Sequence, residues 1–185
     1  MHTRTWIALG SVAAGILTLT ACSAGAGRKP AARETPCSAP EQTAEAVVTD
    51  SEAARLAKDL AGALPTITLT AAYTEATDPS GEMGKPHQYT SRSAFSDIRV
   101  RKSPKVMEVA GSGPDVISCG GTIEVFATDD DAKAWADAVD EQSRVVASLI
   151  PRDHVLRRGR YVIRASSLLT ASQVSEYTAA LIKLR

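Results

Sequence analysis

The chain has 185 residues, with 21 basic and 21 acidic side chains, so it carries no net charge at pH 7. This balance gives no indication of a nucleic-acid or polyanion partner. Apolar residues make up 44% of the chain but aromatic ones only 4%, so a core must consist mainly of Leu, Ile, Val and Ala.

The N-terminus has the organisation of an export signal. Arg4 precedes an uncharged apolar stretch over residues 6–21, which is shorter than the about 20 residues that a membrane-spanning helix needs. Residues 19–22 read Leu-Thr-Ala-Cys and resemble the lipobox of bacterial lipoproteins. The resemblance implies that a diacylglycerol is attached to the Cys22 thiol, that residues 1–21 are removed, and that the acyl chains hold the protein on the membrane. An uncleaved transmembrane helix and ordinary secretory cleavage are the alternatives.

The chain contains three cysteines. If Cys22 carries lipid, Cys37 and Cys119 remain, and export places both in an oxidising compartment where disulfides persist. A Cys37–Cys119 disulfide is the simplest interpretation, with two free thiols as the alternative. A metal or redox pair is disfavoured because the sequence has no CxxC motif and no His at ligand spacing.

Composition divides the chain into three parts. Residues 23–45 are rich in Ala, Gly, Pro, Ser and Thr, which is typical of a tether. We therefore predict a signal peptide over 1–21, a lipidated Cys and tether over 22–49, and one extracytoplasmic domain over 50–185.

The predicted domain mixes helices and strands. Helical spacing and capping residues predict helices over about 51–64, 128–149 and 170–184. Alternation predicts strands over about 67–71, 95–101 and 122–127, and a hairpin over 153–165 that turns near Arg158-Gly159. The fold class is therefore α+β, an antiparallel sheet with helices packed on one face, and a permuted ferredoxin-like plait is a candidate topology. Outside these elements, residues 66–95 and 102–118 give no clear pattern.

Two stretches resemble a known family. Residues 77–91, TDPSGEMGKPHQYTS, are similar to the TDPNxLLGRPxxYTS segment of small actinobacterial membrane lipoproteins. The GGTIEVF strand at residues 120–126, with the helix and Arg-Gly hairpin that follow, resembles the later half of those proteins. This chain departs from the family in having Ser80 in place of Asn, and Glu82-Met83 in place of an apolar pair. The resemblance implies a cell-envelope location and no activity.

The turn-rich loop that follows residue 77 is the first candidate binding site. It brings Asp78, Glu82, His87 and Tyr89 into one short stretch with two Pro and two Gly, and long ordered loops often carry function. Asp78, Glu82 and His87 could ligate a divalent ion, but EF-hand spacing is absent, so we predict no metal. Asp78 before Pro79 is also an ordinary start of a turn.

A basic face of the hairpin is the second candidate. We expect it to present Arg157, Arg160 and Arg164, with Arg99 and Arg101 joining if their strand lies nearby. Arginine forks suit the phosphates of lipid headgroups or wall polymers. The alternative is a solvated face on which Asp153 and Glu124 are the partners.

Motifs of known enzyme classes are missing from the sequence, which has no GxSxG, HExxH, P-loop or dinucleotide fingerprint. We therefore expect no cofactor and predict a membrane-anchored extracytoplasmic binding or interaction module. Its partner would be an envelope protein or an anionic envelope ligand, and not nucleic acid. The alternative is a small envelope hydrolase that uses His87 and nearby acids.

Overall fold

The structure, a computed structural model, describes Cys37 and residues 50–106, 117–145 and 151–184. The chain divides into two units, Met1–Arg33 and Glu34–Arg185, and every described residue belongs to the second. The predicted lipidation site at Cys22 lies outside the described residues. In the part of the chain that is described, no helix is both long and apolar enough to cross a membrane.

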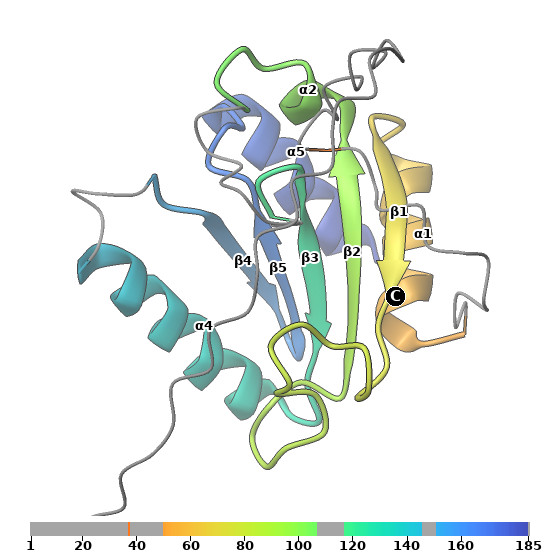
Figure 1. The fold of residues 1–185 in the computed structure, drawn as a ribbon, viewed down its shortest axis with the longest axis vertical. Coiled ribbons are helices and arrows are strands. Elements are labelled where there is room, and N and C mark those ends of the chain that lie inside the picture. Colours follow the sequence, from red (N-terminus) through yellow and green to blue (C-terminus); the bar gives the residue numbers. More distant parts are fainter. Residues whose placement is uncertain (1–36, 38–49, 107–116, 146–150, 185) are drawn as a thin grey trace, which may run out of the picture. The chain divides into compact units, whose positions relative to one another are not determined.

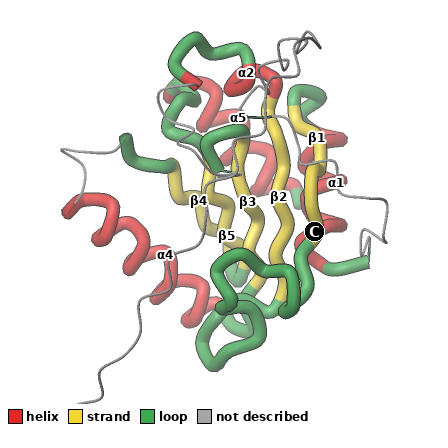
Figure 2. The backbone as a smooth tube through the Cα atoms, in the orientation of Figure 1, coloured by secondary structure: helices red, strands yellow, loops and turns green. Residues whose placement is uncertain are grey.

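The protein has an α+β fold, as predicted. Five strands form one antiparallel sheet in the order β1-β2-β3-β5-β4 (Figures 1 and 2). The strands are β1 Ile67–Ala72, β2 Ser91–Asp97, β3 Gly120–Val125, β4 His154–Arg158 and β5 Tyr161–Ala165. The helices are α1 Glu52–Ala63, α2 Ile98–Arg101, α4 Asp129–Val145 and α5 Ala171–Lys183.

Helices α1 and α5 cover one face of the sheet, behind the strands in Figure 1. Alternate residues of the three inner strands point to this face, among them Phe95, Ile123 and Ile163, and all three are fully buried. They pack with Leu60 of α1 and Tyr177 of α5. Burial of this continuous apolar layer is the main source of stability for the fold.

The opposite face of the sheet is covered by α4 and by the segment that joins β1 to β2. Ala132 of α4, with Trp135 beside it, packs against Phe126, Ala94 and Val162 in a second apolar cluster. The prediction that the helices pack on one face is therefore wrong for α4, because the strands bury apolar side chains on both faces. The ferredoxin-like plait stays a prediction.

Helix boundaries follow the capping signals in the sequence. The Ser51 hydroxyl accepts a hydrogen bond from the backbone N–H of Ala54 at 3.2 Å, and α1 ends shortly before Pro65. Thr170 and Gln173 form the predicted capping box at the start of α5. Each cap satisfies backbone N–H groups that have no partner within the helix.

The predicted strand over 95–101 is partly wrong. Strand β2 ends at Asp97, and residues 98–101 form the helical turn α2. The Asp97 carboxylate accepts hydrogen bonds from the backbone N–H of Arg99 at 2.9 Å and from its guanidinium at 2.7 Å. These bonds turn the chain, so the alternation of apolar and basic residues here belongs to a helix with only Val100 buried.

The hairpin is present, but its turn lies one residue later than predicted. Arg158 pairs with Tyr161 and Leu156 with Ile163, so Gly159 and Arg160 are the two turn residues. Gly159 has φ of 55°, and a glycine adopts this left-handed conformation without steric cost.

The predicted Cys37–Cys119 disulfide is confirmed. The two Cα atoms are 5.4 Å apart, and the bond joins positions separated by 82 residues. Cys119 immediately precedes β3, and its carbonyl accepts a hydrogen bond from the backbone N–H of Asp97 at 3.1 Å. The bond therefore fixes Cys37 to the start of a central strand.

Candidate functional site

Asp78 lies at the centre of the segment between β1 and β2, residues 73–90, which we call the Asp78 loop. Its side chain is completely buried and forms an ion pair with Arg92 of β2 at 2.9 Å. The second carboxylate oxygen accepts hydrogen bonds from the Ser80 hydroxyl at 2.7 Å and from the Tyr89 hydroxyl at 2.8 Å. Asp78 thus ties the loop to β2 of the sheet.

Backbone groups complete the surroundings of Asp78. The N–H groups of Glu82 and Met83 donate to the same carboxylate oxygen at 3.0 and 3.1 Å. Burial opposes ionisation, but hydrogen bonds from Ser80, Tyr89, Met83 and Arg92 outweigh it and hold the pKa of Asp78 well below its ordinary value. The carboxylate is therefore committed to interactions within the protein, and it has a structural role.

Tyr89 is also part of the interior. Its ring contacts Phe126 and Trp135 edge-on, with centroids 6.1 and 6.4 Å apart. Burial, assisted by the Asp78 carboxylate, raises the pKa of Tyr89 to about 12. The Tyr89 hydroxyl therefore stays protonated and donates its hydrogen bond to Asp78 under ordinary conditions.

Glu82 and His87 lie on the outside of the Asp78 loop. Glu82 pairs with Lys85 at 2.8 Å on the exposed surface. His87 has φ of 62°, its side chain is 85% exposed, and its Nδ1 lies 2.7 Å from the Asp131 carboxylate of α4. The structure thus brings the side chains of Asp78 and Tyr89 together. The side chains of Glu82 and His87 point to other partners on the surface. Over the described ranges, no three His, Cys, Asp or Glu residues gather into a possible metal site.

The predicted arginine face does not form as one surface. Arg160 lies in the hairpin turn and pairs with Glu52 of α1 at 2.5 Å. Arg164 pairs with Asp153 at 2.8 Å and stacks over the Trp135 ring at 5.9 Å, so these two arginines already have acidic partners.

The other members of the predicted face are dispersed as well. Arg157 is exposed on β4 and donates to the Gly159 carbonyl at 3.0 Å. Arg99 belongs to α2, where it pairs with Asp97 and with Glu176. The arginines of the hairpin therefore do not form one surface of unpaired cations.

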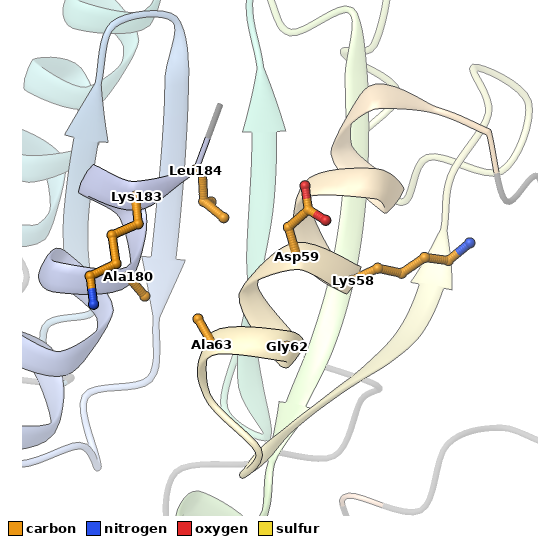
Figure 3. Close-up of a pocket in the computed structure, with 7 residues that line it drawn as sticks. All are labelled: Lys58, Asp59, Gly62, Ala63, Ala180, Lys183 and Leu184. Carbon is orange, nitrogen blue, oxygen red and sulfur yellow. The ribbon is translucent and has the colours of Figure 1, made fainter.

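A groove between α1 and α5 is a further candidate site, which we call the α1–α5 groove. It has a volume of about 390 Å³, and Figure 3 shows it as a gap between the two helices above the sheet. The residues that line it are Lys58, Asp59, Gly62, Ala63, Ala180, Lys183 and Leu184. Ala63, Ala180 and Leu184 point toward the gap.

Small residues explain why the groove exists. Gly62 and Ala63 on α1 and Ala180 on α5 all line the groove, and their side chains are too small to fill the space between the two helices. Arg158 donates to the carbonyls of Leu181 (2.7 Å) and Leu184 at the end of α5. This contact offsets the negative end of the helix dipole beside the groove.

Three of the residues that line the groove are charged. Lys58, Asp59 and Lys183 are all exposed, and Figure 3 shows the side chains of both lysines leading away from the gap. Lysine stems can lie along an apolar surface while the ammonium group stays in water. With two lysines and one aspartate, the lining carries one net positive charge.

Sequence patterns alone did not indicate this groove. The helix over about 51–64 was predicted from the helical spacing of apolar residues such as Leu56 and Leu60. Gly62 and Ala63 lie outside that spacing. Small residues beside an apolar stripe on two helices are the available signal, but they indicate a groove only when the helices are known to be neighbours. No family model, curated protein or solved structure matches this chain.

Proposed function

We propose that the protein is a lipid-anchored extracytoplasmic binding module that takes an anionic amphiphile of the cell envelope in the α1–α5 groove. The observation that carries the proposal is the groove itself. In the part of the domain that the structure describes, its lining combines the apolar side chains of Ala63, Ala180 and Leu184 with two lysines and an aspartate.

The disulfide supports the extracytoplasmic part of the proposal. Disulfides persist in exported proteins and are rare in the cytosol. Because Cys37 and Cys119 are bonded to each other, Cys22 is the one cysteine left to carry a diacylglycerol. Two or more acyl chains are enough for stable membrane attachment.

The lining supports the class of ligand. A volume of about 390 Å³ falls within the roughly 300–1,000 Å³ of small-molecule sites. Ala63, Ala180 and Leu184 offer contact to an acyl chain, and the long exposed side chains of Lys58 and Lys183 would turn toward an anionic headgroup when it binds. An anionic envelope ligand is thus retained from the sequence prediction, but its site moves from the arginines to the groove.

Titration with short-chain lipids tests the groove. The full chain is titrated with dihexanoyl phosphatidylglycerol, and the methyl NMR signals of Ala63 and Ala180 are followed. We expect saturable shifts with this lipid and much weaker ones with dihexanoyl phosphatidylcholine. The paired change Lys58→Glu and Lys183→Glu should abolish the difference between the two lipids.

Lys102→Glu with Lys105→Glu is the matched control, because it makes the same charge change at exposed positions away from the groove. This control should bind like the wild type. Equal responses to both lipids, or equal losses in both paired variants, would contradict the proposal.

Mass spectrometry of the protein from its native membrane tests the anchor separately. We expect a diacylglycerol on an N-terminal Cys22 and a Cys37–Cys119 bond. An unmodified Cys22 in the mature chain would show that the anchor is not a lipid.

A small envelope hydrolase is the second candidate function. The observation that favours it is the 2.7 Å contact between His87 Nδ1 and the Asp131 carboxylate, because a carboxylate that orients a histidine is a recurrent part of general-base sites. Assay of the full chain against a panel of chromogenic esters tests this. Hydrolysis that disappears in both His87→Ala and Asp131→Asn would support it, and absence of turnover would exclude it for ester substrates.

A further inference from the structure

A group of buried and half-buried charges lies on the side of the sheet that faces α4. Arg92 and Glu124 are direct partners in the pairing of β2 with β3, and Thr122 and Arg164 are partners in the pairing of β3 with β5. Arg92 also reaches Asp78 from the same position. Neighbouring strands thus place these side chains next to one another in the interior.

The acids of this group differ in their hydrogen bonding. Asp78 accepts several hydrogen bonds, and Asp153 pairs with Arg164 at 2.8 Å. Glu124 is only 1% exposed, yet neither of its carboxylate oxygens has a hydrogen-bond partner. Arg92 Nε is 3.4 Å away. The Thr122 hydroxyl is close enough to favour the ionised form without meeting hydrogen-bond geometry.

The charges of the group do not balance when every acid is ionised. The buried acids Asp78 and Glu124 supply two negative charges and the buried Arg92 one positive charge, while Arg164 is paired with Asp153 and both of these are 24% exposed. Burying an uncompensated carboxylate is costly, and such groups take up a proton instead. Glu124 is the acid with the fewest hydrogen bonds, so protonation costs least there.

We propose that Glu124 is a proton-binding site that couples external pH to the Asp78 loop through Arg92. A proton from the solvent adds to one carboxylate oxygen of Glu124 and removes the excess negative charge. Burial raises the pKa of Glu124 and Asp78 raises it further, while Arg92, Thr122 and Arg164 oppose the rise.

Arg92 is the link because it contacts both the loop and the sheet. Its Nη1 pairs with Asp78 at 2.9 Å while its Nε faces Glu124 at 3.4 Å. When Glu124 is ionised, Arg92 is shared between two carboxylates. When Glu124 is protonated, Arg92 and Asp78 form a balanced pair, and the loop is held more firmly.

The remaining neighbours belong to other elements packed around this group. Tyr73 follows β1, and the charges of Arg92, Asp78 and Glu124 act on the pKa of its hydroxyl. The Arg92 guanidinium lies over its ring at 5.5 Å. From α4, the Trp135 ring lies beneath Arg164. Neither ring carries a charge that would replace the proton on Glu124, since burial raises the pKa of Tyr73.

Carbon-13 NMR of the full chain with labelled glutamate carboxyl groups tests the proposal. We expect the Glu124 carboxyl signal to titrate at a pH clearly above the ordinary value of about 4.3 for glutamate. The Arg92 Nε–H and Tyr89 ring signals should shift with the same midpoint. The exposed Glu82 carboxyl serves as the internal reference, and Glu124→Gln identifies the Glu124 signal.

Two results would overturn the proposal. One is a Glu124 carboxyl that titrates at or below about 4.3, and the other is Arg92 and Tyr89 signals that do not follow it. If Glu124→Gln fails to fold, the wild-type signal can be assigned through its own bonded atoms, so the titration still decides. Stability gives a second measurement: because the folded-state pKa is raised, the stability contribution is complete at low pH and is lost as pH rises through that pKa.

Discussion

Replacing Asp78 by alanine should destabilise the domain strongly. The change leaves Arg92, whose side chain is only 9% exposed, without its closest partner, and it leaves the Ser80 and Tyr89 hydroxyls without their acceptor. Removing one partner of a buried ion pair costs about 3–5 kcal/mol. Glu124 remains 3.4 Å from Arg92, so we expect a loss near the lower end, about 3 kcal/mol.

Urea denaturation of the full chain, with Trp135 fluorescence as the signal, measures this loss. For a domain of this size, it corresponds to a fall in Tm of about 6–12 °C. Glu82→Ala is the matched control, because it removes an acid from the same loop. The ion pair of Glu82 with Lys85 is exposed. The control should change stability by no more than about 0.5 kcal/mol.

The pH dependence of the Asp78 variant adds a further check. Hydrogen bonds lower the pKa of Asp78 in the folded state, so its contribution is complete above the unfolded value of about 3.9 and is lost as pH falls below it. The difference between wild type and Asp78→Ala should therefore be largest near neutral pH and shrink in acid. A loss under about 1 kcal/mol at pH 7, in the range of an ordinary surface change, would refute the structural role of Asp78.

Three further changes should affect stability through separate parts of the fold. Joint replacement of Cys37 and Cys119 by serine should cost about 4 kcal/mol in the chain-entropy model, because the bond closes 82 residues; equal denaturation midpoints with and without the bond would argue against it. Gly121→Ala should cost about 2–3 kcal/mol, since its new Cβ would lie 2.3 Å from the backbone carbonyl of Arg164, and thermal unfolding measures the effect. Thr170→Ala should cost about 1 kcal/mol by removing the N-cap of α5, and an unchanged urea midpoint would show that the cap is dispensable.

Local signals in the sequence were sufficient for most helices and strands. Ser51 and Thr170 begin helices where their side chains can cap the backbone, and the strand predicted over 122–127 is present as β3 over Gly120–Val125. The turn at Asp97 was missed because a side chain that caps its own backbone depends on a short-range hydrogen bond and not on periodicity. Residues 98–101 alternate two apolar residues with two arginines. A pattern this short fits a helical turn as well as a strand.

The candidate site was harder to predict because it depends on contacts between distant segments. Asp78 and Tyr89 were grouped correctly, but their burial against Arg92 is set by the packing of the loop on the sheet. Arg160 was assigned to the hairpin face, whereas one residue of difference in the turn directs it to Glu52, 108 positions earlier. The role of Glu124 follows from the strand order, since Arg92 and Arg164 flank it from β2 and β5.

On the proposed lipid anchor at Cys22, the disulfide also limits how far the domain can lie from the membrane. Cys37 is 15 positions after Cys22, whereas the first residue of the folded domain before α1, Asp50, is 28 positions after it. At a maximum of about 3.5 Å per residue, the fully extended reach is about 50 Å with the bond and about 100 Å without it. The bond attaches the segment that leads from Cys22 at the start of β3, so reduction would raise the upper limit on the distance between the anchor and the domain.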